Sequence, residues 1–208
     1  TAPDCAAAVN QCGLLLEGLG NQVSVGHPLP LESLDYLYDY ITVIRVSLAT
    51  DLTALAATIQ RPWQEADMEN GTWVNFQRGL KVSAVDYALA RARLFGWSRD
   101  LISWWQDFDV LLLPTLATPP PTVGHLVTGP ERERTDRLAA TIPFTPQFNV
   151  SGQPAISLPL FMSTDEHALP IGVQLVGAPG REDLLIGLAA ALEEAAPWHQ
   201  RQPHMMAT

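Results

Sequence analysis

Apolar residues recur at helical spacing in several stretches of the chain. The first stretch has steps of four and three residues and predicts a helix from about Pro3 to Leu19, with apolar positions at Cys5, Val9, Cys12, Leu16 and Leu19. The same spacing predicts a helix from Ser33 to Leu48 and a further helical stretch over residues 51–59, which continues or follows it and ends before Pro62.

Two more helices are predicted by their end signals. Ser83 and Asp86 have the spacing of a capping box, and the apolar positions behind them continue to about Asp107. Glu182 and an adjacent aspartate place negative charge in the first turn of the last helix, which a proline at position 197 ends.

Short apolar runs between the helices predict strands. Val23 and Val25 alternate with polar residues over 22–26, and "DVLLLPT", "PAISLPL" and "PIGVQLVG" are nearly continuous apolar runs. Such runs are typical of strands that helices cover on both faces. Because helices and strands alternate, the sequence predicts one layered α/β domain, or part of one.

Three segments have no clean period. Residues 61–79 are expected to be rich in loops, and residues 118–140 to form a Pro-rich and charged surface excursion. From Pro143 to Phe161 prolines alternate with small polar and bulky apolar residues, a pattern that no helix is expected to tolerate. The Gly152-Gln153-Pro154 cluster predicts a turn in front of the strand from Ala155.

Composition limits the class of protein. The chain has 208 residues, 47% of them hydrophobic, which is enough for a sizeable core. The formal net charge of −10 disfavours a nucleic-acid partner, and no run of about 18 uninterrupted apolar residues predicts a membrane helix. Two free cysteines fit a reducing compartment, so we expect a cytoplasmic protein. Because the chain begins without Met, Thr1 is expected to be an internal position of a longer protein or a processing product.

The usual catalytic motifs are missing from the sequence. It contains no G-x-S-x-G, S-x-x-K, H-E-x-x-H, C-x-x-C or Walker A pattern. Lys81 and Ser83 could suggest a Ser–Lys pair, but residues two apart do not face each other on a helix, so a solvated lysine is the preferred interpretation. We therefore expect no catalytic residue, metal site or cofactor site within these 208 residues.

The C-terminal third carries a specific pattern. "PFTPQFNVSGQPAISLPL" followed by "LPIGVQLVGAPGREDLLIGLAAALEEAAPW" resembles the C-terminal region of the amidase signature enzymes. The matching positions are Phe144, Thr145, Asn149, Ser151, Gly152, Pro154, Ala155, Ser157, Pro159, Gly172, Gln174, Gly177, Glu182, Leu184, Leu185 and Trp198. Upstream segments are also similar, with Asn21 where the family commonly has a histidine.

The resemblance implies a fold and an activity. It implies a layered α/β/α fold with a mixed central sheet, of which residues 1–208 form the C-terminal portion of a single domain. The family hydrolyses amide bonds with a Ser, a second Ser on a cis peptide and a Lys, which precede this region. The implied partners are the N-terminal catalytic half of the same enzyme and a small-molecule amide substrate.

The resemblance also assigns roles to residues of the motif. Phe144 and Asn149 are the expected substrate-side residues, because the motif turn approaches the catalytic serines. The expected structural residues are Thr145, Ser151, Gly152, Pro154, Gln174 and Gly177. A purely architectural motif remains an alternative for all of them.

Two other functions stay open. The chain could be a non-catalytic homologue that binds an amide-like ligand or a partner protein, or a subunit of a tRNA-dependent amidotransferase. The net charge of −10 disfavours the second. A reading frame upstream of Thr1 that encodes the Lys and the Ser-Ser signature would favour the amidase.

Overall fold

The chain forms two compact units. The computed structural model describes residues 1–166, 168–199 and 201. The first unit combines residues 1–27 with the chain from Ile102 onward, and the second is Pro28–Leu101. Each unit has its own packing, and the single domain expected from the sequence stays a prediction.

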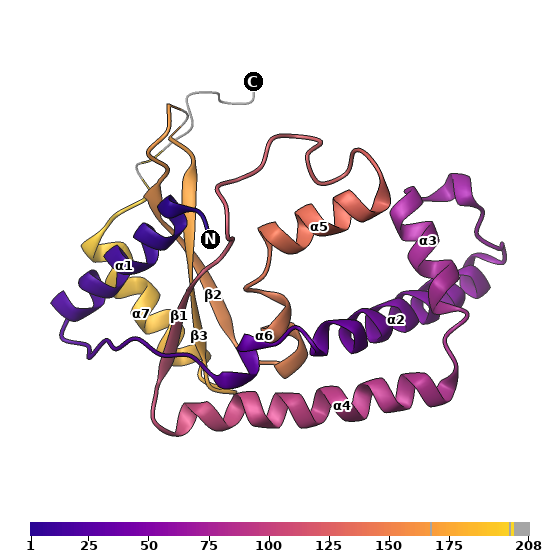
Figure 1. Ribbon diagram of the computed structural model, residues 1–208, viewed down its shortest axis with the longest axis horizontal. Helices are drawn as coiled ribbons and strands as arrows, with labels where there is room; N and C mark the ends of the chain where they lie inside the picture. The colour runs from indigo at the N-terminus through magenta and orange to yellow at the C-terminus, as the bar shows by residue number, and fades with distance from the viewer. Residues whose placement is uncertain (167, 200, 202–208) are drawn as a thin grey trace. The chain divides into compact units, whose positions relative to one another are not determined.

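The first unit is built from helices on a small sheet (Figure 1). Its elements are α1 (Pro3–Gly18), η3 (Ser103–Gln106), β1 (Val110–Pro114), α5 (Glu131–Thr141), α6 (Pro146–Ser151), β2 (Ala155–Met162), β3 (Pro170–Gly177) and α7 (Glu182–Ala195). The arrangement of helix and sheet confirms the predicted α/β class.

The three strands lie in the order β1-β3-β2, and both pairs are antiparallel. The resemblance implies a mixed sheet, but the strands described here contain no parallel pair. The β2–β3 register shifts between Leu158 and Phe161. This irregularity accommodates Pro159, which has no N–H for a ladder hydrogen bond.

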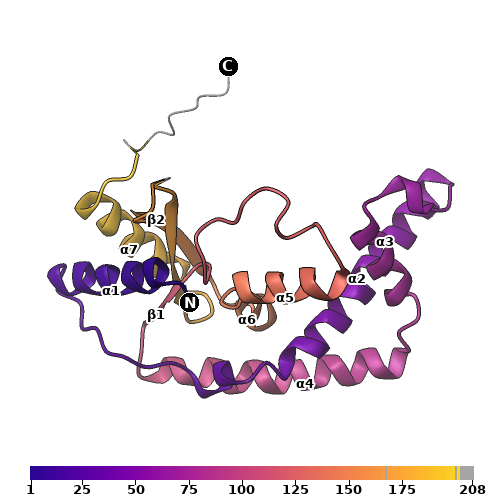
Figure 2. The same ribbon diagram turned by 45° about the horizontal axis from the view of Figure 1, so that its top comes forward.

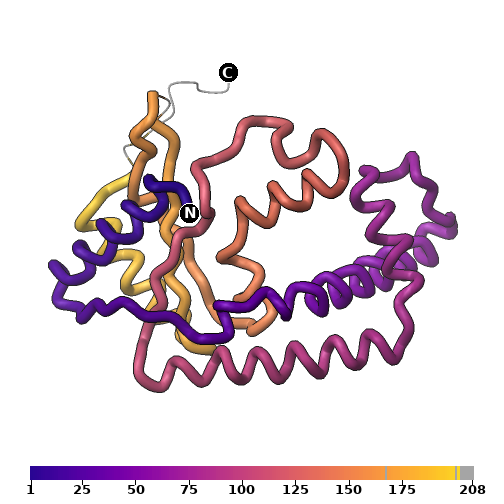
Figure 3. Tube along the Cα trace, viewed as in Figure 1, coloured from indigo at the N-terminus to yellow at the C-terminus, as the bar shows by residue number. Residues whose placement is uncertain are grey.

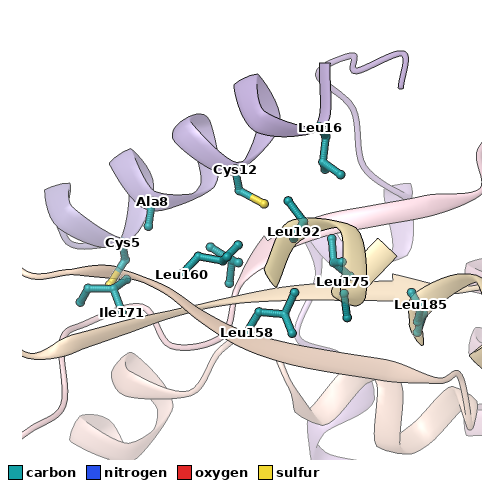
Figure 4. Close-up of a cluster of buried hydrophobic side chains, with 12 residues drawn as sticks. Cys5, Ala8, Cys12, Leu16, Leu158, Leu160, Ile171, Leu175, Leu185 and Leu192 are labelled. Carbon is teal, nitrogen blue, oxygen red and sulfur yellow. The ribbon is translucent and has the colours of Figure 1, made fainter. Parts of the chain in front are cut away.

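Helices α1 and α7 lie side by side on one face of the sheet (Figures 1 and 2). Figure 4 shows Cys5, Ala8, Cys12 and Leu16 of α1 facing apolar side chains of the strands and of α7. Leu160, Leu175 and Leu192 are at most 1% exposed, and each contributes about 1.5–3 kcal/mol by leaving water. The stripe predicted for the first helix is confirmed at Cys5, Cys12 and Leu16, and Val9 is partly buried against the core, but Leu19 lies beyond the end of α1 and is 43% exposed.

Both ends of α1 are fixed by side-chain hydrogen bonds. The Asp4 carboxylate accepts two bonds of 2.9 Å, from the backbone N–H and the hydroxyl of Thr164. At the other end, the Asn21 amide donates to the Leu16 carbonyl at 3.0 Å. The Asn21 backbone N–H donates to the same carbonyl at 3.0 Å, so residue 21 binds the end of the helix through both its backbone and its side chain.

The strand predicted over residues 22–26 is wrong. These residues have no regular structure, and Val25 is fully exposed. An alternating pattern makes a strand only where a neighbouring strand supplies hydrogen bonds, and none of the described strands pairs with this segment.

The region from Pro143 to Phe161 does contain a helix, so its exclusion was wrong. Pro146 is the first residue of α6, where the missing N–H of proline removes no helical hydrogen bond. Gly152 ends the helix with φ 69° and donates from its N–H to the Phe148 carbonyl at 2.9 Å. Proline at the start and glycine at the end delimit a short helix.

The surface excursion predicted over residues 118–140 has two parts. From Thr115 the chain runs without regular structure to Pro130 (Figure 3), and Glu131–Thr141 then forms α5. Glu131 and Glu133 lie in the first turn of α5, where negative charge stabilises a helix.

The second unit is helical. It consists of η1 (Leu29–Glu32), α2 (Tyr36–Ile59), η2 (Glu65–Asp67), α3 (Asn70–Gly79) and α4 (Ala84–Ile102), whose last residue belongs to the first unit. The two helical stretches predicted over 33–59 form one helix, because no residue between them breaks the hydrogen-bond pattern. One bond of the capping box predicted at Ser83 is present, with the Asp86 N–H donating to the Ser83 hydroxyl at 3.0 Å.

The loop predicted over residues 61–79 is wrong, because it contains η2 and α3. Asn70 and Gly71 are weak helix formers and hide the start of α3 in the sequence. Tertiary packing compensates, since α3 packs on α2 through Gly79 and Phe76 is buried.

Helix α2 is long and apolar enough to cross a membrane, judged by length and composition, with a mean hydropathy of 1.4. Core helices of soluble proteins meet the same criteria, so this is weak evidence. Polar groups of α2 make hydrogen bonds within the second unit: the Asp39 carboxylate accepts from Arg93, and Arg45 donates to Asn75. The expected absence of a membrane partner stays a prediction.

Candidate functional site

The motif segment that contains α6 lies on the face of the sheet opposite α1 and α7 (Figure 1). Ser157 of β2 pairs in register with Gln174 of β3, so both side chains are on this face. Their neighbours along the strands, such as Leu158 and Leu175, point into the core. The two faces of the sheet therefore differ in chemistry.

Gln174 holds the start of the motif segment. Its side-chain amide donates to the Phe144 carbonyl at 2.9 Å, and the side chain is buried. Within the segment, Gln147 donates to the Pro143 carbonyl at 2.6 Å. The backbone just before α6 is thus bound to the middle strand by a side chain.

Gln153 holds the end of the same segment. Its amide nitrogen donates to the Gly177 carbonyl at 3.0 Å, and its oxygen accepts from the Ser151 hydroxyl at 2.9 Å. The Gly177 N–H donates to the Pro154 carbonyl at 3.0 Å. Because Gln153 is 6% exposed, its hydrogen bonds are shielded from competing water.

A pair of hydroxyl groups lies on the same face. Thr115 follows β1, and its Oγ1 atom lies 2.6 Å from the Ser157 Oγ atom. A Cβ on Gly172 would lie 2.9 Å from the first oxygen and 3.0 Å from the second. Glycine at this position therefore leaves the room that the hydroxyl pair occupies.

A small cavity of about 80 Å³ adjoins this pair. Its lining includes Cys5, Thr115, Leu116 and Gly172. Burial raises the pKa of the Cys5 thiol, with a contribution from the neighbouring Asp4 carboxylate. The thiol is therefore protonated at neutral pH and is a weak nucleophile.

The described residues of this site supply hydrogen-bonding groups, but they do not include a nucleophile that is hydrogen-bonded to a general base. Neither Thr115 nor Ser157 has a side-chain hydrogen bond to a histidine, a lysine or a carboxylate among the described residues. No group of three or more His, Cys, Asp or Glu that could hold a metal ion occurs in residues 1–166, 168–199 and 201.

The structure brings most of the expected motif residues together. Four of them take part in the hydrogen bonds between the α6 segment and β3, namely Ser151, Pro154, Gln174 and Gly177. The fifth, Gly152, ends α6. Thr145 is the residue before α6 and makes no side-chain capping bond. Phe144 is half-buried and Asn149 is exposed on α6, so the two expected substrate-side residues lie in one segment.

Sequence reasoning missed three contributors. Gln153 stands inside the predicted turn, and only the structure shows that it is buried and bonded to the Gly177 carbonyl. Thr115 comes directly after a strand, a frequent place for site residues, and this position is the signal that could have found it. Gly172 matches the motif, but only the structure shows its contact with the hydroxyl pair.

Comparisons with known proteins agree on one family. The family model described as Amidase matches residues 1–186. The chain is 38% identical over 98% of its length to the 6-aminohexanoate-cyclic-dimer hydrolases of Pseudomonas sp. (strain NK87) and Paenarthrobacter ureafaciens. It is 35% identical over 88% of its length to the putative amidase AmiC of Mycobacterium tuberculosis (strain ATCC 25618 / H37Rv).

Solved structures give the same result. The structure of 6-aminohexanoate cyclic dimer hydrolase complexed with substrate matches 97% of the chain with a TM-score of 0.88 and 38% identity. This chain spans 43% of the length of that hydrolase and 38% of the length of AmiC. The family match, the identities and the fold together show that the chain belongs to the amidase family, the amidase signature enzymes.

Proposed function

We propose that this chain is the C-terminal part of an amidase that hydrolyses carboxylic amide bonds. The Ser, the second Ser and the Lys of the family mechanism would precede Thr1, in the part of the protein that the relatives have and this sequence lacks. The observation that supports a working site is the double attachment of the α6 segment to β3, through Gln174 at one end and Gln153 at the other. In this proposal the chain supplies sheet, helices and a wall of the substrate pocket.

Phe144 and Asn149 are the proposed substrate-side residues. Phe144 offers an apolar ring and Asn149 an amide that can donate and accept hydrogen bonds. Their segment is bound to the sheet through backbone carbonyls and buried amides, so their positions are fixed before a substrate arrives. Such preorganisation lowers the entropy lost on binding.

A small amide is the proposed substrate, and the 6-aminohexanoate cyclic dimer is the first compound to test. The reason is the 38% identity over nearly the whole chain to hydrolases named for that compound. Neutral polar groups line the described face, which suits an uncharged amide. A charged substrate would need compensating charge there.

The first test uses the intact protein that contains this chain. It should release amino groups from the cyclic dimer or from other amides in a broad panel, and a serine-directed fluorophosphonate should label it. Absence of both activity and labelling would reject the amidase proposal and favour the non-catalytic binding homologue.

A second test addresses the wall. Gln174→Met removes the hydrogen bond to the Phe144 carbonyl while keeping the side-chain length, and we expect KM to rise or kcat to fall by about tenfold. Gln11→Met, on the exposed face of α1, is the matched control and should leave both constants unchanged. Equal kinetics for both variants would show that this attachment does not position the pocket.

We also propose that residues 1–208 without the upstream half are inactive and incomplete. The outer strands β1 and β2 each pair with a described strand on one side only, so each can accept a further strand. Size-exclusion chromatography with mass spectrometry tests this, because a stable monomer of 22.7 kDa without a bound upstream fragment would contradict it.

A further inference from the structure

The second unit contains a cavity of about 290 Å³ where three of its helices meet. One side is a stripe of α2 that includes Asp39, Thr42 and Arg45. The end of α3 and the turn after it add Arg78 and Lys81, and α4 completes the lining. All of the lining residues belong to the second unit.

The lining is strongly cationic, in contrast to the chain as a whole. Four of the twelve Lys and Arg residues of the sequence line this one cavity, namely Arg45, Arg78, Lys81 and Arg93. The lining contains two carboxylates, Asp39 and Asp86, so a formal excess of two positive charges remains. In a chain of net charge −10, this concentration requires an explanation.

The two carboxylates already have partners. Asp39 is 6% exposed and accepts two hydrogen bonds from the Arg93 guanidinium, at 2.6 and 2.7 Å. This pair raises the pKa of Arg93, so its charge is permanent. Asp86 accepts from the Ser83 hydroxyl at 2.7 Å, which holds it in the first turn of α4.

Close packing fixes the cationic side of the cavity. Gly79 lies so near α2 that a Cβ there would be 2.1 Å from the Arg45 carbonyl oxygen. The end of α3 is therefore fixed on α2, and Arg78 and Lys81 are held on either side of this contact. The Arg45 guanidinium donates to the Asn75 side chain at 2.9 Å, which orients it from α3.

We propose that this cavity binds a small dianion, a phosphate or a dicarboxylate. The guanidinium groups match the geometry of carboxylate and phosphate oxygens, and hydrogen bonds between charged groups are the stronger class. A volume of about 290 Å³ is at the lower end of the range for ligand sites, which favours a ligand of few atoms. Two excess positive charges balance a dianion.

Calorimetric titration of the intact protein with inorganic phosphate and with succinate tests the proposal, at constant ionic strength set with chloride. Binding of at least one of the two is expected. Lys81→Gln and Arg78→Gln should each weaken that binding by about tenfold, corresponding to one charged hydrogen bond. Lys81 is exposed in the turn, so its replacement is expected to leave the thermal unfolding temperature unchanged.

Arg91→Gln is the matched control, because Arg91 lies on α4 outside the cavity and over the Tyr87 and Phe95 rings. It should leave the affinity unchanged. The proposal is overturned if neither anion binds, or if Arg91→Gln weakens binding as much as Lys81→Gln does. If neither anion binds and Arg78→Gln also lowers the unfolding temperature, an acidic side chain from the rest of the polypeptide occupies the cavity instead.

Discussion

Gly152 ends α6 in the left-handed region of backbone conformation, with φ 69° and ψ 21°. Its N–H donates to the Phe148 carbonyl at 2.9 Å, so the conformation also completes the hydrogen bonding of the helix. A Cβ added here would have no heavy atom within 4 Å. The effect of a side chain at this position is therefore a backbone effect without a steric clash.

Because no steric clash is involved, the change in the free energy of unfolding follows from backbone terms alone. The left-handed conformation costs an L-residue about 1–2 kcal/mol, whereas Gly→Ala gains about 0.4–1 kcal/mol by restricting the unfolded chain. We therefore expect Gly152→Ala to destabilise the protein by roughly 1 kcal/mol. Gly152→Val should reach about 1–3 kcal/mol, because a β-branched residue is strained further in this region.

Thermal unfolding of the intact protein, followed by circular dichroism, measures the effect. Gly187→Ala is the control, since Gly187 lies within α7 and a Cβ there also meets nothing within 4 Å. Alanine should stabilise that helix by about 0.5–1 kcal/mol, so identical substitutions should shift the Tm in opposite directions. A rise in Tm for Gly152→Ala would refute the reasoning.

Three further predictions come from packing and burial. Gly79→Ala should lower the free energy of unfolding by about 3 kcal/mol or more, because its Cβ would overlap the Arg45 carbonyl, and a melt within a degree of wild type would contradict the close packing. Gly172→Ala should displace the Thr115 hydroxyl and lower kcat/KM with little change in Tm, which steady-state kinetics checks. Burial raises the pKa of Cys12 from 9.0 to about 11, so the stability that the protonated thiol contributes is complete below pH 9 and is lost as the pH rises toward 11. Urea unfolding of the protein and of Cys12→Ala at several alkaline pH values measures this loss.

The long periodic elements could be predicted because the apolar pattern that buries each one lies within its own sequence. The α1 stripe, β1, β3 and α7 each have one apolar face or run, and each occurs close to its predicted bounds. The presence of α3 and the absence of a strand over residues 22–26 could not be predicted, because both depend on partners that are distant in sequence. Val23 and Val25 have strand character but no strand beside them.

The candidate site was accessible from the sequence only in part. The motif identified Gln174, Gly177 and the Gly152 turn, and the structure places them in one network. The hydrogen bond between Gln174 and the Phe144 carbonyl joins residues 30 positions apart, and that of Gln153 with Gly177 joins residues 24 apart. No local pattern encodes such pairings, because the acceptors are backbone carbonyls that every residue has.

The choice of glutamine at both attachment points has a physical reason. A buried carboxylate or ammonium would need a paired charge, whereas an amide donates to a carbonyl without one. Gln153 uses both ends of its amide, and the donor end of Gln174 alone has a described partner. Replacing Gln153 should therefore loosen both the end of α6 and its attachment to β3. Replacing Gln174 should loosen only the segment before α6.

The alternation along the strands explains how a small sheet serves two purposes. In β2, Leu158 and Leu160 belong to the core, while Ser157 lies on the opposite face beside Thr115. In β3, Val173 and Leu175 are fully buried among α1 and α7, and Gln174 between them binds the α6 segment. A shift of one residue in register would bury the polar set and expose the apolar one, so the hydrophobic core also fixes the position of the site.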